Sequence, residues 1–108
     1  MSEAGMPRRL VVVDGRILMQ ACSLYKRHPA AVLNRHHVVP ESWWLAAGRP
    51  VASPLVSICP TCHGDVHAGI DALIAGHDIS ALPRNCRRLA KQALELAAEY
   101  GLTPAPTL

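Results

Sequence analysis

The stretch CPTCHGDVH, residues 59–67, brings two cysteines and two histidines close together in the chain. Cys59 and Cys62 have the C-x2-C spacing with which a tight turn presents two thiolates to one tetrahedral zinc ion. Such a pair needs two further ligands from elsewhere in the chain. A redox pair and two unrelated buried thiols are the alternatives, and no βαβ pattern surrounds the pair to favour the redox function. The spacing therefore favours a structural zinc site.

Histidines form two further pairs with metal-binding potential. His63 and His67 are four residues apart on a predicted helix, so their imidazoles share one face and can bind one ion. His36 and His37 are adjacent near the end of a predicted strand, where alternation lets one bind a metal while the other faces a substrate. Surface decoration is the alternative for each pair. Because Cys62 and His63 are neighbours that point in different directions, we expect a sulfur-rich site and a separate histidine-rich site.

The elements that must position these residues follow from hydrophobic periodicity and turn residues. Asp14-Gly15 favours a hairpin turn, Pro40 ends a strand, and Gly101 ends an amphipathic helix. The cysteine and histidine cluster lies at a strand-to-helix junction. The expected order is a β-hairpin at about 9–20, a strand at about 31–39, a short helix after Pro40, a strand at 55–58, a helix that starts in the cluster, and a helix at about 84–100.

Composition limits the class of protein. With 108 residues, half of them hydrophobic and 18% charged, the chain should fold as one domain and not be disordered. It has no Phe, so its core is thin and a bound metal would add to its stability. The net charge of +3 is compatible with a polyanionic partner. No apolar run is long enough to span a membrane and the N-terminus makes a poor signal peptide, so we expect a cytoplasmic protein whose four cysteines serve metal or redox chemistry.

Taken in order, the elements HHVVP and ICPTCHGDVH resemble the zinc-bearing form of the HNH endonuclease family. The family pattern is roughly C-x2-C, then HH-[IV]-x-P, then N-L-x2-L-C-x2-C-H-x3-H. The match runs from about Cys22 to Ile70, and the chain is similar to the small free-standing HNH proteins of bacteriophage genomes. The resemblance implies an α+β fold with a ββα-metal core, two strands and a helix around one ion. Combined with the pattern above, it predicts a single nuclease domain over 1–108, with its core at about 22–75, an N-terminal β-hairpin, a C-terminal helix at about 84–100 and a loose tail at 102–108.

By position, the resemblance implies that His37 is the general base and that His36, His63 and His67 hold a catalytic divalent ion. Cys59 and Cys62 would bind a separate structural zinc. The implied reaction is hydrolysis of DNA phosphodiester bonds, by nicking or by double-strand cutting. Three imidazoles without a carboxylate favour Zn, Ni, Co or Mn over Mg. Phosphate contacts are expected from Arg35, Lys26, Arg27 and Arg49.

The chain departs from the family pattern at two places. Only Cys22 remains of the first C-x2-C, because Tyr25 stands where the second cysteine would be. Cys86 or His28 could supply the missing zinc ligand, and a small buried hydrophobic side chain is the alternative role of Cys86. The middle Asn of the family is Pro54 here, so another group must hold His37.

A zinc-stapled module that binds nucleic acid or another protein, without catalysis, is the competing function. A staple needs only four ligands, and this chain offers more, which favours the nuclease. DNA is the expected partner and no membrane is expected. Phage packaging or other DNA-processing proteins remain open as protein partners, and a phage-encoded chain would act in the host cytoplasm.

Overall fold

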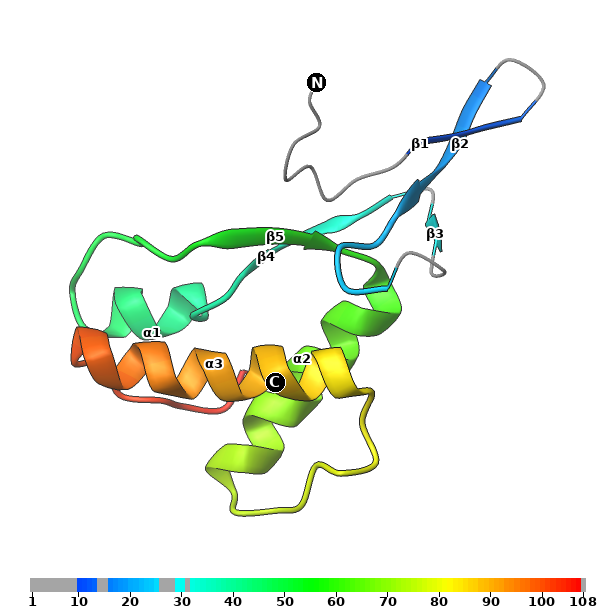
Figure 1. Cartoon of the computed structure of the whole chain (residues 1–108). Coiled ribbons are helices and arrows are strands. Elements are labelled where there is room, and N and C mark those ends of the chain that lie inside the picture. The colour runs from blue at the N-terminus through cyan, green and yellow to red at the C-terminus, as the bar shows by residue number, and fades with distance from the viewer. Residues whose placement is uncertain (1–9, 14–15, 26–28, 31, 108) are drawn as a thin grey trace.

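The computed structural model describes residues 10–13, 16–25, 29–30 and 32–107 and shows a small α+β chain (Figure 1). Within these residues, no helix combines the length and hydrophobicity that a membrane span requires. Two antiparallel sheets and three helices follow one another. The strands are β1 (Leu10–Val13), β2 (Arg16–Ala21), β3 (Pro29–Ala30), β4 (Asn34–His37) and β5 (Leu55–Ile58), and the helices are α1 (Glu41–Ala46), α2 (Pro60–Ile74) and α3 (Arg84–Tyr100).

Strands β1 and β2 pair antiparallel, which confirms the predicted hairpin, and β3 extends this sheet in the order β1-β2-β3. The turn expected at Asp14-Gly15 lies outside the described residues. The strand predicted at about 31–39 is shorter, because β4 ends at His37. The next two N–H groups turn to the loop before β5: Val38 donates to the Pro54 carbonyl at 3.0 Å and Val39 to the Ser53 hydroxyl at 2.8 Å.

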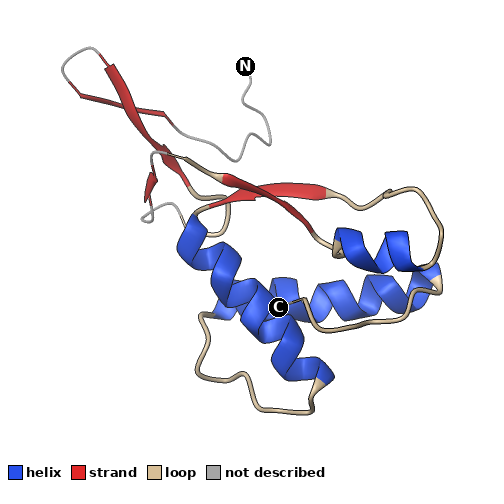
Figure 2. Cartoon of the chain, turned by 180° about the vertical axis from the view of Figure 1, so that it is seen from behind, coloured by secondary structure: helices blue, strands red, loops and turns tan. Residues whose placement is uncertain are grey.

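Strands β4 and β5 form the second sheet, and α2 follows β5 almost at once (Figure 2). Their antiparallel register pairs His36 with Val56 and His37 with Leu55. Side chains alternate along β4, so that His36 is buried while Arg35 is exposed. This sheet therefore presents His36, and not its basic neighbour, to the helices.

The core lies between this sheet and the helices. Trp43 and Trp44 are both buried in it and supply bulk that the Phe-free chain otherwise lacks. Helices α2 and α3 approach closely at Gly69, where an added Cβ would lie 3.0 Å from the Ala90 Cβ. The predicted C-terminal helix is confirmed at Arg84–Tyr100, and Gly101 ends it with a left-handed φ of 71°.

Residues 102–107 correct the expectation of a loose tail; Leu108 lies outside the described residues. Leu102 is only 5% exposed, and the indole N–H of Trp43 donates to the Ala105 carbonyl at 2.8 Å. Thr107 hydrogen-bonds to α2 through Asp71. These partners come from distant parts of the chain, so the proline-rich composition of the segment gave no sign of them.

Candidate metal centres

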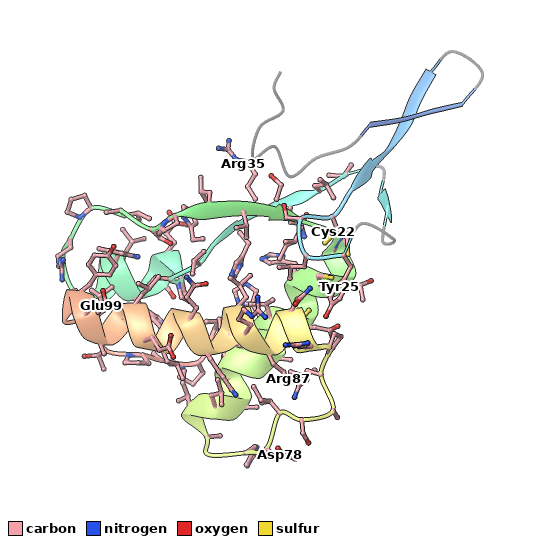
Figure 3. The ribbon with its side chains drawn as sticks, viewed as in Figure 1. Cys22, Tyr25, Arg35, Asp78, Arg87 and Glu99 are labelled. Carbon is pink, nitrogen blue, oxygen red and sulfur yellow. The ribbon has the colours of Figure 1, made fainter. Side chains whose placement is uncertain are left out.

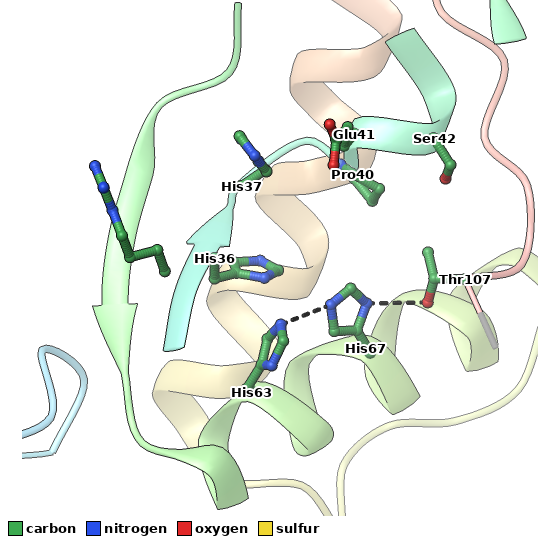
Figure 4. A pocket seen from close by; sticks show the side chains of 9 residues that line it. His36, His37, Pro40, Glu41, Ser42, His63, His67 and Thr107 are labelled. Carbon is green, nitrogen blue, oxygen red and sulfur yellow. Dashed lines mark hydrogen bonds between the residues drawn. The ribbon is translucent and has the colours of Figure 1, made fainter. Parts of the chain in front are cut away.

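His36, His63 and His67 converge in one cluster (Figure 4). His36 comes from β4, and the two others come from successive turns of α2, where their spacing puts them on one face. The His36 ring centroid lies 5.3 Å from that of His63 and 5.1 Å from that of His67, and the His63 and His67 centroids are 4.6 Å apart. The three residues that the sequence suggested as one ligand set therefore do lie together.

The nitrogen atoms of this cluster are spaced for one ion. One ligand nitrogen from each histidine lies within 4.8 Å of the other two. The Nε2 atoms of His63 and His67 are 3.0 Å apart, and two nitrogens on a tetrahedral zinc would be about 3.3 Å apart at the usual bond length. Among the described residues, His36 Nε2 is buried without a hydrogen-bond partner. A buried unpaired nitrogen costs roughly 1–3 kcal/mol, which an ion bound there would offset. The three residues thus fit a metal.

Burial keeps these imidazoles neutral, as metal ligands must be. Burial, and after it the neighbouring His67, His63 and His37, lower the pKa of His36 to about 3. Burial also lowers the pKa of His63. For His67, burial and then His63 lower the pKa, while the carboxylate of Asp71 opposes them. At neutral pH each ring therefore offers a lone pair.

Two polar residues that the sequence analysis did not single out contact the outer nitrogens of this cluster. The Asn34 side-chain amide lies 2.9 Å from His63 Nδ1, and the Thr107 hydroxyl lies 3.0 Å from His67 Nδ1. Strand alternation could have found Asn34, because it lies two residues before His36 and so on the same side of β4. No local pattern points to Thr107.

His37 lines the same pocket but points away from the cluster (Figure 4). Its Nδ1 is buried and has no hydrogen-bond partner within the described residues. Pro54, at the position where the resemblance expects an Asn, accepts a hydrogen bond from the N–H of Val38, the residue after His37, at 3.0 Å. The pocket has a volume of about 200 Å³ and is lined by Arg35, His36, His37, Pro40, Glu41, Ser42, His63, His67 and Thr107.

Of the basic residues expected to contact phosphate, one lines the pocket and another does not. Arg35 is exposed and lines the edge of the pocket. Arg49 does not line it; its guanidinium donates to the Tyr100 carbonyl and lies 5.3 Å from the centre of the Trp44 ring. In this structure Arg49 joins the end of α3 to the core. Lys26 and Arg27, with the alternative zinc ligand His28, fall outside the described residues.

Three cysteines form a second cluster, called the sulfur cluster below. One sulfur from each of Cys22, Cys59 and Cys62 lies within 4.8 Å of the other two, and all three residues are buried. Cys59 caps α2, because its sulfur accepts a hydrogen bond from the Cys62 N–H at 3.4 Å. This group can hold a metal ion and is separate from the histidines, as the divergence of Cys62 and His63 predicts.

Cys86 is fully buried near this sulfur cluster, but it is not one of the three residues whose sulfurs all lie within 4.8 Å of one another. It lies in the first turn of α3, whose start is tied to the loop after Cys22 (Figure 3). The Asn85 N–H donates to the Tyr25 hydroxyl at 2.7 Å, and the Asn85 side chain donates to the Leu24 carbonyl at 2.9 Å. Tyr25, at the position of the missing family cysteine, thus anchors the helix that carries Cys86.

The thiols of the cluster differ in acidity. Burial raises the pKa of Cys22, but backbone hydrogen bonds from Cys59, Tyr25 and Leu24 outweigh it and the net pKa is lowered. Burial raises the pKa of Cys62, and its neighbours Cys59 and Cys22 raise it further. One thiolate is therefore stabilised by backbone donors, whereas several can coexist here only beside a cation.

We predict that Cys59→Ser lowers the melting temperature sharply or prevents folding. The substitution removes one sulfur from a cluster that joins the loop after β2 to the start of α2, and metal affinity at such a site contributes directly to folding free energy. Circular dichroism melting curves and zinc content by mass spectrometry measure the effect. An unchanged melting curve with full zinc content would contradict a structural metal at the cysteines.

We also predict that low pH destabilises the fold through His36. Its folded-state pKa, about 3, lies below the ordinary value of about 6.5, so the unfolded chain binds the proton first as the pH falls. Stability is then complete above about pH 6.5 and is lost toward pH 3, by up to ~1.4 kcal/mol for each pH unit.

Urea unfolding at pH 7.5, 6.5 and 5.5 tests this pH dependence. Wild type should lose more stability than His36→Gln between pH 6.5 and 5.5. The exposed His77 offers a control, because His77→Gln should keep the wild-type pH dependence. Equal slopes for wild type and His36→Gln would show that His36 is not a buried neutral imidazole.

Comparison of this chain with models of known protein families, with curated proteins and with solved structures finds no match. The two clusters, and the pocket beside one of them, are therefore the features that indicate its function.

Proposed function

We propose that this chain is a metal-dependent endonuclease of the HNH type that hydrolyses phosphodiester bonds in DNA. The observation that carries the proposal is the convergence of His36, His63 and His67 beside a pocket that His37 also lines. Two antiparallel strands followed by a helix hold these side chains, as a ββα-metal core would. The ordered HH and H-x3-H elements of the sequence support the same function.

Each side chain has a separate role in this proposal. His36, His63 and His67 would hold a divalent ion through neutral nitrogens, and such an ion would supply positive charge toward the phosphodiester. His37 is the general base that accepts a proton from the attacking water. His37 lines the same pocket but stands apart from the three ligands, which supports this division, because a base must reach the substrate without binding the ion.

The pocket suits part of a polymer better than a whole small molecule. At about 200 Å³ it is smaller than the roughly 300–1,000 Å³ of ligand pockets in general, yet it has room for an ion and one phosphate group. Arg35 at its edge offers a positive charge to a neighbouring phosphate. These features favour a nucleic acid backbone as the substrate, and DNA is the substrate class that the sequence resemblance implies.

The sulfur cluster serves as a structural zinc site in this proposal, with Cys86 as its fourth ligand. Cys86 is buried against Cys62, and Tyr25 and Asn85 fix the start of α3 so that its thiol stays there. A fourth thiolate would complete the tetrahedral shell that structural zinc sites have. The zinc would then join the loop after β2, the start of α2 and the start of α3.

Cys86→Ala tests this fourth ligand. We predict that it lowers zinc affinity and the melting temperature, since alanine keeps a small apolar group at the site but removes the sulfur. Competition with a chelator measures the affinity. If Cys86 were only a buried hydrophobic side chain, Cys86→Ala would bind zinc as wild type does, whereas Cys59→Ser would not.

His37→Ala and His67→Ala separate the proposed catalytic roles. We predict that His37→Ala slows plasmid nicking by roughly 10²–10⁴-fold, the usual contribution of a positioned base, and keeps both metals. His67→Ala should lose the ion at the histidines and keep the zinc. Nicking assays with Mn, Ni, Co, Zn and Mg, and metal content per chain, measure these effects.

His77→Ala is the matched control, because this exposed histidine does not line the pocket and should leave nicking unchanged. Wild-type nicking by His37→Ala, or loss of its metal as in His67→Ala, would reject His37 as the base. A wild-type protein that binds one ion per chain, at the cysteines, and nicks no DNA would favour the zinc-stapled binding module.

A further inference from the structure

The segment after α3 returns to the histidine cluster and is held there at successive points. Gly101 turns the chain, and Leu102 is buried with its N–H donating to the Ala97 carbonyl at 2.8 Å. The chain then runs back past α3 toward α2 (Figures 1 and 2). Trp43 holds the Ala105 carbonyl, and prolines at 104 and 106 restrict the backbone on both sides of it.

Thr107 bridges two residues of α2 that lie one helical turn apart. Its N–H donates to Asp71 Oδ1 at 2.7 Å, and its hydroxyl lies 3.0 Å from the same oxygen. The hydroxyl also lies 3.0 Å from His67 Nδ1. A carboxylate only accepts, so the single hydroxyl proton goes to Asp71 and the oxygen accepts the Nδ1 proton of His67.

This direction of hydrogen bonding decides which nitrogen of His67 is free. With Nδ1 protonated, the neutral ring carries its lone pair on Nε2, which is the nitrogen that faces His63 at 3.0 Å. Asn34 does not favour a free Nε2 on His63, because its NH₂ group (Nδ2) lies 2.9 Å from His63 Nδ1, which then accepts the hydrogen bond. Within the histidine cluster, the Asp71–Thr107 pair therefore favours the tautomer of His67 that has its proton on Nδ1.

We propose that residues 102–107 form a strap that positions His67 for metal binding, with the Thr107 hydroxyl, held by Asp71, fixing its tautomer and ring orientation. The proposal rests on the proposed metal site at the histidines. Thr107 contacts the outer nitrogen of His67 and not the metal-facing one, so it is a positioning residue. Outer partners of this kind change metal affinity by about 10- to 100-fold.

Thr107→Val and Thr107→Ser test the strap as a pair, since valine keeps the shape without the hydroxyl and serine keeps the hydroxyl. Cobalt(II) is titrated into protein with zinc at its cysteines, and the absorption of the histidine-bound cobalt gives the affinity. We expect Thr107→Val to bind cobalt about 10- to 100-fold more weakly than wild type, and Thr107→Ser to bind it nearly as wild type does. Thr103→Val, at an exposed threonine of the same segment, should change nothing.

Nitrogen-15 NMR of the His67 ring gives a readout that does not depend on activity. In metal-free wild type and Thr107→Ser, Nδ1 should carry the proton, and in Thr107→Val the ring should populate both tautomers. The Trp43 indole N–H resonance reports whether the segment stays seated on Ala105.

The outcomes separate the strap from the proposed function. Equal cobalt affinity and an unchanged tautomer in Thr107→Val would overturn the strap alone. Equal losses in Thr107→Val and Thr107→Ser would also overturn it, because the hydroxyl would then not be the cause. A wild-type protein that binds no cobalt at the histidines would overturn both proposals.

Discussion

The turn from β5 into α2 is the constraint on which both clusters depend. β5 is paired with β4, and α2 begins at Pro60, directly after Cys59 caps it. The chain therefore has little freedom between β5, which pairs with the strand that carries His36, and α2, which carries His63. A shift of one residue at this junction would rotate the following helix by about 100°. Such a rotation would turn Cys62 away from the sulfur cluster and the histidines away from His36, so one junction sets the geometry of both groups.

The sequence predicts those parts of the site that depend on local spacing. C-x2-C, H-x3-H and the alternation at His36 and His37 are local relations along a helix or strand, and α3 shows its apolar face directly. The hydrogen bond from Asn85 to the Tyr25 hydroxyl and the seat of Thr107 on α2 join residues far apart in the chain, and no local pattern encodes them. Arg49 shows the same limit, because its charge suggests phosphate but the fold uses it at the end of α3, where a cation is favourable.

A metal bound at the sulfur cluster would make up for a thin core. In a chain without Phe, two tryptophans supply most of the bulk around α1, while the four buried cysteines lie where three segments meet. Apolar packing alone contributes little to the free energy of folding in so small a domain, and a metal at the cysteines would link these segments directly. Stability of the scaffold and metal binding at the sulfurs should therefore be coupled, whereas the histidine cluster lies on that scaffold and contributes less to it.

The two clusters differ in their surroundings in the way that structural and catalytic metal sites differ. The sulfur cluster is enclosed, since each cysteine is buried and the Cys22 sulfur already accepts backbone hydrogen bonds. The histidine cluster has one buried ligand, His36, and two half-buried ones that border a pocket. Structural zinc sites are closed by four protein ligands, while catalytic sites keep a position open for water or substrate. Three histidine ligands would leave such a position at a bound metal, and His37 lines the pocket beside them.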